Sequence, residues 1–392
     1  MSQPAPGGEI ATPPGLGTVL REWGRLGCIG FGGPPTHIKL LRELCVERHQ
    51  WLDPQEFEDA IAACNLLPGP ASTQLAIFSA WRVRGRAGAI VGGLAFIIPG
   101  LTMILALSAL FLEGSPPRWV LGVGAGAGAA VAAVAAHAAT TLVQPSWTRH
   151  PDHHRWIAYV LAGAAASALL GPWVAVVLIA CGLIELAGRN LAPRQSTARS
   201  ASAIPILATA TLTLGTLAQV AWVALKVGAL SYGGGFVIVP LMQHDAVDTH
   251  QWLTAGQFLN AVALGQITPG PVVHTVAAVG YGAGGLATGL LAASVAFTPS
   301  FGFVLLGARH FGRLRRNERA AAFLGGAGPA AIGAIFGATI PLTRALSERW
   351  QYAVLAAAAV TLLVLRRGTV LTLLTAGSVG VVVALAGGPL PR

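Results

Sequence analysis

The chain has 392 residues, of which 54% are hydrophobic and only 10% are Asp, Glu, Lys or Arg. A soluble domain carries about 25% charged residues, so this chain has too few to cover a globule in water, and a soluble enzyme is excluded. The net charge of +10 comes from 23 Arg and two Lys against 15 acids, a pattern that favours short cytoplasmic loops next to a lipid bilayer over nucleic-acid binding.

The first half of the chain predicts only helical elements. A hydrophobic segment (16–33) ends in Phe31-Gly32-Gly33 and is followed by a polar stretch (35–56). Two short apolar pieces (57–67 and 70–81) flank Pro68-Gly69-Pro70. Two long spans (87–112 and 119–141) and a closely spaced pair (157–188) complete this half. About 20 residues are needed to cross about 30 Å of hydrocarbon. The pieces beside Pro-Gly-Pro are shorter, so they predict a re-entrant hairpin of two half-helices that meet in mid-membrane.

The second half repeats this order at an offset of 201 residues. Residues 27–70 are identical to their counterparts at 15 of 44 positions, including His49-Gln50-Trp51-Leu52 and the Pro-Gly-Pro motif. The corresponding segments are 204–234, 240–256, 258–268 and 271–282, 287–308, 320–341, and 351–386. We therefore expect an N-terminal repeat (1–188), a cytoplasmic linker (189–203) and a C-terminal repeat (204–392).

The arginines predict that the two repeats have opposite orientations. Five crossings per half, about ten in all, would turn the second copy upside down. The loops around the first hairpin are rich in Lys and Arg, whereas their counterparts in the second half have none. The bias is reversed after the next span, between loop 113–118 and loop 309–319. An inverted repeat places 18 basic loop residues inside and four outside, in agreement with the positive-inside rule.

The Pro-Gly-Pro breaks are the first candidate for a binding site. Inverted repeats with broken helices are typical of secondary transporters. Proline suits the first turn of a helix, and the free N–H groups of that turn attract anions. Amides that precede each break could donate further hydrogen bonds. The candidate binding residues are Asn65, Gly69, Pro70, Ser72 and Thr73 in the first half, and Gln266, Gly270, Pro271, His274 and Thr275 in the second. The alternative is a pair of kinked structural helices.

Two basic residues in apolar segments are further candidates. Arg25 and Lys226 are equivalent under the 201-residue offset, and a cation at membrane depth is typical of a substrate pathway. Alternatively, their charges could snorkel to the membrane surface. Nearby glycines would permit close approach of backbone to a ligand, or equally close helix packing. These are Gly32, Gly33, Gly233 and Gly234.

Other residues give weaker signals. His150, His153 and His154 are interpreted as a solvated cytoplasmic loop, and the four cysteines have no metal-binding spacing. We expect no catalytic residue, no metal and no cofactor. A membrane-embedded enzyme is the alternative from a different class, although no catalytic motif lies in a span.

The combined motifs resemble the chromate ion transporter family. The resemblance rests on Phe31-Gly32-Gly33-Pro34, His49-Gln50-Trp51-Leu52 and Asn65-Leu66-Leu67-Pro68-Gly69-Pro70, and on their second copies. It implies a secondary transporter of the bacterial inner membrane that exports chromate from the cytoplasm and confers chromate resistance. Sulfate, the structural analogue, or another oxyanion is the alternative substrate. The coupling ion and a homodimer are left open.

The topology can be tested by single-cysteine labelling at Ser115 and Asn317. An impermeant reagent should reach Ser115→Cys from the periplasm and Asn317→Cys from the cytoplasm, because the arginine bias is reversed between these equivalent loops. Labelling of both from the same side would contradict the inverted repeat.

Overall fold

The computed structural model describes residues 14–112, 116–170, 173–190, 215–231, 237–311 and 317–391, and every regular element in these ranges is a helix. The elements of the first half are α1 (Leu16–Ile29), α2 (Pro34–Arg42), the π-helical turn η1 (Glu43–Arg48), α3 (Pro54–Leu66), α4 (Ala71–Leu112), α5 (Arg118–Arg149), α6 (His153–Ala165), η2 (Ala166–Leu170) and α7 (Val174–Asn190).

The second half has the same order of elements. They are α8 (Thr216–Leu230), α9 (Ile238–Gln243), η4 (His244–Thr249), α10 (Ala255–Ile267), η5 (Val272–His274), α11 (Thr275–Gly284), α12 (Leu286–Gly307), η6 (Ala308–His310), α14 (Glu318–Arg344), α15 (Arg349–Ala359), η7 (Val360–Val364) and α16 (Thr369–Leu385). Small features recur as well. Gln50 and Gln251 both have φ of 51°, and both copies contain π-helical turns at η1 and η4.

The helices next to Pro-Gly-Pro are short, as the sequence predicts. α3 and α10 end just before the motif, and α4 and η5 begin just after it. The first part of α4 stops at Arg84 and Gly85, where the backbone leaves helical geometry and Gly85 has φ of 62°. Glycine adopts this conformation without steric strain. The segment 71–83 is therefore a helix of its own, much shorter than a membrane crossing.

Among the described residues, four helices are long and apolar enough to cross a membrane: α4, α5, α12 and α14. Together with shorter apolar helices such as α8, α15 and α16, they identify a multi-pass membrane protein. α1 has only 14 residues. This is about 21 Å of helix, which is less than the about 30 Å of hydrocarbon in a bilayer. The polar stretches 35–56 and 240–256 are largely helical, because Leu41, Cys45 and Met242 turn inward to the core.

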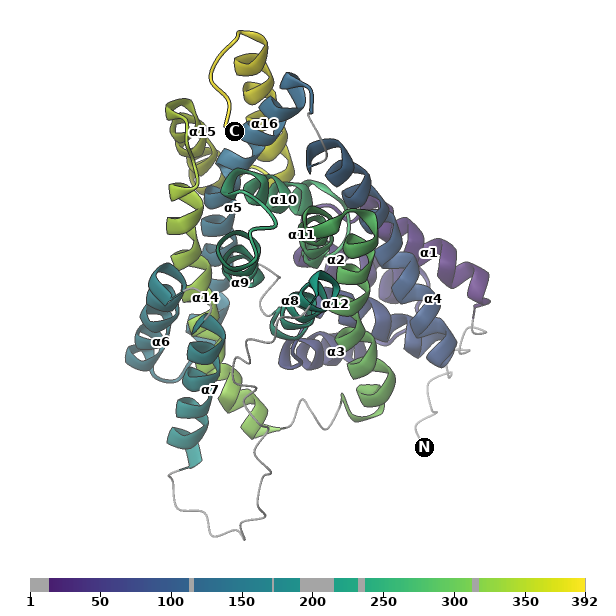
Figure 1. Cartoon of the computed structure of the whole chain (residues 1–392). Coiled ribbons are helices and arrows are strands. Elements are labelled where there is room, and N and C mark those ends of the chain that lie inside the picture. The colour runs from purple at the N-terminus through teal and green to yellow at the C-terminus, as the bar shows by residue number, and fades with distance from the viewer. Residues whose placement is uncertain are drawn as a thin grey trace, which may run out of the picture.

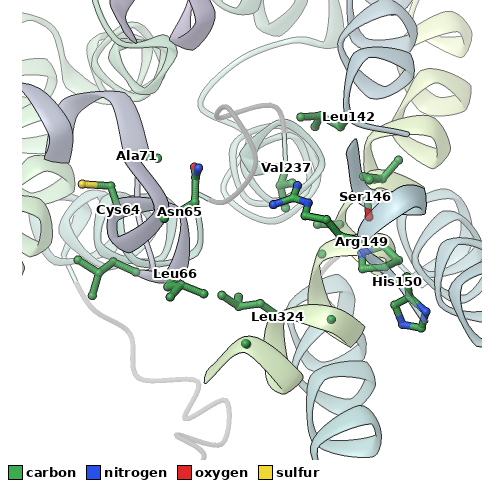
Figure 2. A pocket seen from close by; sticks show the side chains of 18 of the residues that line it. Cys64, Asn65, Leu66, Ala71, Leu142, Ser146, Arg149, His150, Val237 and Leu324 are labelled. Atoms are coloured by element: carbon green, nitrogen blue, oxygen red, sulfur yellow. The ribbon is translucent and has the colours of Figure 1, made fainter. Parts of the chain in front are cut away.

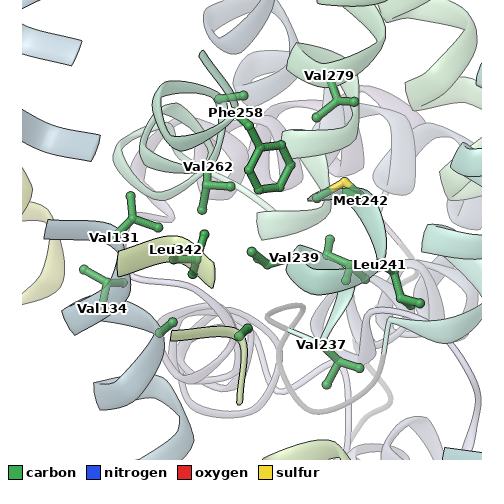
Figure 3. Packing of buried hydrophobic residues seen from close by; sticks show 14 of the residues in the cluster. Val131, Val134, Val237, Val239, Leu241, Met242, Phe258, Val262, Val279 and Leu342 are labelled. Atoms are coloured by element: carbon green, nitrogen blue, oxygen red, sulfur yellow. The ribbon is translucent and has the colours of Figure 1, made fainter. Parts of the chain in front are cut away.

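The two halves are interwoven. The final pair of the first half, α6 and α7, packs on α14, while α15 and α16 of the second half pack on α5. Figure 1 shows α6 and α7 beside the lower part of α14, and α15 and α16 beside the upper part of α5. The hydrophobic core follows this exchange, since Val131 of α5 and Leu342 of α14 share a cluster with Met242 of α9 and Phe258 of α10 (Figure 3).

Small residues make the exchanged contacts possible. A Cβ atom at Gly380 of α16 would lie 1.9 Å from the carbonyl oxygen of Gly122 in α5, and one at Gly333 of α14 would lie 1.9 Å from that of Val160 in α6. Helices that associate in lipid depend on this kind of close backbone approach.

Gly380→Ala should therefore lower the thermal stability of the detergent-solubilised protein. Overpacking of this kind costs about 1–3 kcal/mol. Gly302→Ala in α12 is the matched control, because nothing lies within 4 Å of its Cβ position and Ala is the better helix former. The two midpoint temperatures, measured by loss of the monodisperse chromatographic peak, should move in opposite directions; an unchanged midpoint for Gly380→Ala would contradict the close packing.

Candidate functional site

The first break is a tight turn held by Gln74. Gly69 has φ of 110°, and the Gln74 Nε2 group donates a hydrogen bond to the Pro68 carbonyl over 2.7 Å. The turn leans on the second half: a Cβ at Gly69 would lie 3.2 Å from the Gly228 carbonyl of α8 and 3.4 Å from Ser300 Oγ of α12. Only glycine allows both the backbone conformation and the contact.

The second break leans on the first half in the corresponding way. Gly270 has φ of 88°, and its N–H donates to the Gly30 carbonyl at the end of α1 over 2.9 Å. The Pro269 carbonyl lies only 2.0 Å from the position that a Cβ of Gly100 in α4 would occupy. Each break is thus seated against helices of the other half.

His37 of α2 joins the two breaks. Its side chain is 1% exposed. Nε2 lies 2.9 Å from the Gly30 carbonyl oxygen, and Nδ1 lies 3.2 Å from Ser72 Oγ at the start of α4. A carbonyl can only accept, so Nε2 carries hydrogen, and Nδ1 of the neutral ring accepts from the Ser72 hydroxyl. Gly30 therefore receives hydrogen bonds from both His37 and Gly270.

His274 lies in the first turn after the second break and is fully buried. Its ring packs edge-on against Phe297, 5.3 Å between centroids. The Ile97 and Pro269 carbonyls lie within reach of the ring, and His37 lies within electrostatic range, but neither nitrogen makes a well-formed hydrogen bond. An unsatisfied buried polar group costs about 1–3 kcal/mol.

Other buried polar atoms near the breaks also have no partner within the described ranges. They are Thr73 Oγ1, Gln74 Oε1, Gln266 Nε2 and Ser300 Oγ. Native structures contain few such atoms, and each calls for a ligand, a water or a functional reason. Their grouping makes the region between the breaks the candidate site for a polar ligand.

A cavity of about 520 Å³ reaches the first break from one end of the molecule. Asn65 and Gly69 line one side, and Arg149, His150 and Arg189 line the other. Figure 2 shows Arg149 extended from α5 toward Val237 in the middle of the cavity, opposite Asn65. Ala321, Leu324 and Gly325, in the turns that follow the start of α14, also line the cavity.

Glu185 of α7 organises the basic side of the cavity. It is 1% exposed and accepts hydrogen bonds from Arg189 Nε at 2.9 Å and Tyr159 Oη at 3.1 Å, with Arg155 Nη1 at 3.1 Å. Asp152 caps α6 and helps to position Arg155; the N–H groups of Arg155 and His154 lower the pKa of Asp152. Three guanidinium groups (Arg149, Arg155, Arg189) against the carboxylates of Glu185 and Asp152 give this side a net charge of about +1.

The structure brings together most of the candidates predicted at the breaks, but not the basic pair. Asn65 and Gly69 line the cavity, and Ser72, Thr73, Thr275 and Gln266 are buried around the breaks. Arg25 is exposed on α1. Lys226 forms an ion pair with Asp245, 2.6 Å from Nζ to Oδ2. Their roles in anion binding stay predictions.

The predicted glycines fall into two groups. Gly32 and Gly33 form the turn between α1 and α2, with φ of 100° and 75°, so the turn itself requires them. Gly233 and Gly234 lie outside the described residues, as does Ser115.

Sequence reasoning missed His37, Arg149, Arg189 and Glu185. His37 has no counterpart in the second half, where Ile238 stands at the equivalent position. In the sequence, Arg149 stands beside the histidines of the predicted solvated loop and Arg189 stands at the start of the predicted linker. Only the fold shows that both border a cavity. An isolated glutamate near the end of an apolar segment (174–188) was the one available signal.

Broken helices seated against the opposite half, with a basic cavity leading to one of them, define a membrane transport protein. The chain belongs to the chromate transporter family, because the sequence pattern of that family matches residues 17–186 and 218–381. It is 32% identical to the chromate transport protein of Cupriavidus metallidurans, over 86% of this chain and 85% of that protein.

Two further relatives have similar coverage. The probable chromate transport protein of Synechococcus elongatus is 30% identical over 82% of each chain. The chromate transport protein of Pseudomonas aeruginosa is 28% identical over 86% of this chain and 84% of that one. No solved structure matches this sequence.

The ion pair of Lys226 separates two roles for this lysine. Lys226→Ala should reduce the amount of folded protein, because it leaves Asp245, 9% exposed, without its partner; such a loss costs about 3–5 kcal/mol when fully buried. Lys226→Ala combined with Asp245→Asn should restore the yield of monodisperse protein.

Anion uptake by this double variant then decides the predicted binding role. If Lys226 binds the anion, uptake stays at least about thirtyfold weaker, corresponding to about 2 kcal/mol, although folding is restored. Normal uptake by the double variant would limit Lys226 to a structural role.

Proposed function

We propose that this protein is a secondary transporter that exports chromate from the cytoplasm across the bacterial inner membrane and so confers chromate resistance. The anion enters the cavity, passes the arginines and binds near the midplane at the N-termini of the half-helices after each break. Membership of the chromate transporter family supports the substrate, and the relatives carry the same substrate in their names.

The cavity is the observation that carries this proposal. It connects a basic surface, with a net charge of about +1, to Asn65 and Gly69 at the first break. Chromate is a dianion near neutral pH, so the cavity side is opposite in charge to the substrate. A half-helix N-terminus adds about +0.5 of a charge, and its free N–H groups suit an oxyanion.

The ends of the molecule support the inverted orientation of the repeats. Arg82 of the first half and Arg309 of the second line one small cavity together with Glu56. At the N-terminal end of α5, Arg118 donates a hydrogen bond to the Gly388 carbonyl. Trp350 donates a hydrogen bond to the neighbouring Pro389 carbonyl. Arg82 and Arg309 thus lie on one side although their positions are not equivalent, as expected if the halves are inverted and the breaks are re-entrant.

The proposed substrate-binding set combines both kinds of residue. At the breaks it comprises Ser72, Thr73, Gln266, His274 and Thr275, together with the turns at Gly69-Pro70 and Gly270-Pro271. Arg149 and Arg189 attract the anion from the cytoplasm. Arg25 and Lys226 are retained as proposed contributors of long-range positive charge.

Neutralising the cavity arginines should weaken uptake of chromate into everted membrane vesicles. Arg149→Gln and Arg189→Gln should each raise the half-saturating chromate concentration about tenfold, because a hydrogen bond to a charged group contributes about 1.5–3 kcal/mol. Arg367→Gln, an exposed arginine after η7, removes the same charge far from the cavity and should behave like the wild type.

The same vesicles distinguish the alternatives. Competition by sulfate at the concentration that half-saturates chromate uptake would make sulfate or a broader oxyanion class the substrate. Consumption of chromate in detergent without sealed vesicles would indicate a membrane-embedded enzyme. Equal uptake by all three arginine variants would contradict the proposed entry path.

A further inference from the structure

The two buried histidines come from opposite halves of the chain and from positions that are not equivalent. His37 corresponds to Ile238 and His274 corresponds to Thr73 under the 201-residue offset. They nevertheless converge between the breaks. The Gly30 carbonyl accepts from His37 Nε2 and from Gly270 N–H, and the His274 ring lies directly over Gly270, with Cε1 3.0 Å from its Cβ position.

The partners of the two rings differ in a way that points to a ligand. His37 is satisfied by Gly30 and Ser72. His274 is fully buried, and its nitrogens have the Ile97 and Pro269 carbonyls within reach but no well-formed hydrogen bond. The unpaired Thr73 hydroxyl and Gln266 amide nitrogen belong to the same region. Backbone N–H groups of two helix starts complete a set of donors suited to the oxygens of a tetrahedral oxyanion.

We propose that His37 and His274 form a joint oxyanion- and proton-binding centre, in which binding of the anion is accompanied by uptake of a proton by the histidine pair. This inference rests on the proposed function and adds the proton to it. A neutral imidazole nitrogen without hydrogen cannot donate to an oxyanion, whereas imidazolium donates from both nitrogens. The dianion stabilises this added charge, and by reciprocity the proton strengthens anion binding by the same factor.

The surroundings leave this role to the histidines. The elements packed against them are α1, η1 and α4 for His37, and α4, α8, α10, α11 and α12 for His274. On α1, Glu22 pairs with Arg21 and Arg48; on α8, Lys226 pairs with Asp245. The sequences of α10 and α12 contain no ionisable side chain. The remaining ionisable groups on these elements are Arg25, Cys28, Glu43, Cys45, Glu47, Arg82, Arg84, Arg86 and Tyr281.

None of these other groups is placed as the histidines are. Arg25, Cys28, Glu43 and Glu47 are exposed, and the arginines of α4 begin ten residues beyond Ser72, about 15 Å along the helix. Among the described residues, His37 and His274 are thus the imidazole groups that lie at the breaks.

Isothermal titration calorimetry of the purified protein tests the inference. Chromate is titrated at mildly alkaline pH, where it is fully ionised, in two buffers of different ionisation enthalpy, and sulfate serves as a second probe that does not titrate. The difference between buffers gives the number of protons taken up per anion. We expect net uptake of up to one proton, and an affinity that rises as pH falls, by as much as about tenfold per unit.

His274→Gln should abolish the proton uptake and flatten the pH dependence while weaker anion binding persists. This change removes only the weak contacts of the His274 nitrogens with the Ile97 and Pro269 carbonyls, since no well-formed hydrogen bond is lost. His37→Gln should also reduce the proton uptake, because it removes one of the two imidazole groups. The glutamine amide can still donate to the Gly30 carbonyl, so this variant should fold. His137→Gln in α5 is the matched control and should retain wild-type uptake.

The outcomes separate this inference from the proposed function. Anion binding without proton uptake, or uptake unchanged in both variants, overturns the histidine centre and leaves anion transport intact. If neither chromate nor sulfate binds the wild-type protein, the proposed function fails, and with it the centre.

Discussion

The need to satisfy interrupted backbone inside the membrane shapes this protein. A helix that stops in hydrocarbon exposes N–H and C=O groups that find no water, and non-helical backbone is tolerated there only where protein or a cavity covers it. The carbonyl of Gly30 serves this need directly, because it accepts from Gly270 of the other half and from His37. One oxygen thus ties the end of α1 to the second break.

The exchange of helices between the halves follows from the same constraint. Each break leans on the opposite half through a glycine contact, at Gly228 for the first and at Gly100 for the second. The exchanged final pairs, α6–α7 on α14 and α15–α16 on α5, then enclose the centre. The core cluster around α5 and α14 is built from both halves, while a second cluster lies mainly in the first half and takes Val304, Ala308 and Phe311 from the second. Close contacts between small residues hold this arrangement where lipid provides no hydrophobic drive.

The helices could be predicted from the sequence because proline, glycine and apolar runs act locally. The site was harder to predict because it is formed by contacts between residues far apart in the sequence. The Pro-Gly-Pro motifs marked the breaks to within a few residues, because proline and glycine act on the backbone where they stand. The spans 87–112 and 287–308 correspond closely to the second part of α4 and to α12. The Gly30 carbonyl links His37 to Gly270 of the second break, residues more than 200 positions apart, and no local pattern encodes this link. Arg149 and Arg189 have the sequence signature of loop residues, and only the packing of α5, α7 and α14 shows the cavity they border.

The charge that moves with the substrate connects the two parts of the site. Under the proposed export, a dianion that leaves a cytoplasm at negative potential releases about 4.6 kcal/mol per 100 mV, twice the value for one elementary charge. The potential alone can therefore drive export, but it also makes entry of two negative charges into a low-dielectric centre the difficult step. The arginines compensate this charge at the cavity, and nothing comparable lies at the breaks among the described residues. A proton held by His37 and His274 would halve the net charge in transit and the electrical drive with it. The proton thus lowers the barrier for entry of the anion into the centre and at the same time reduces the electrical driving force for export.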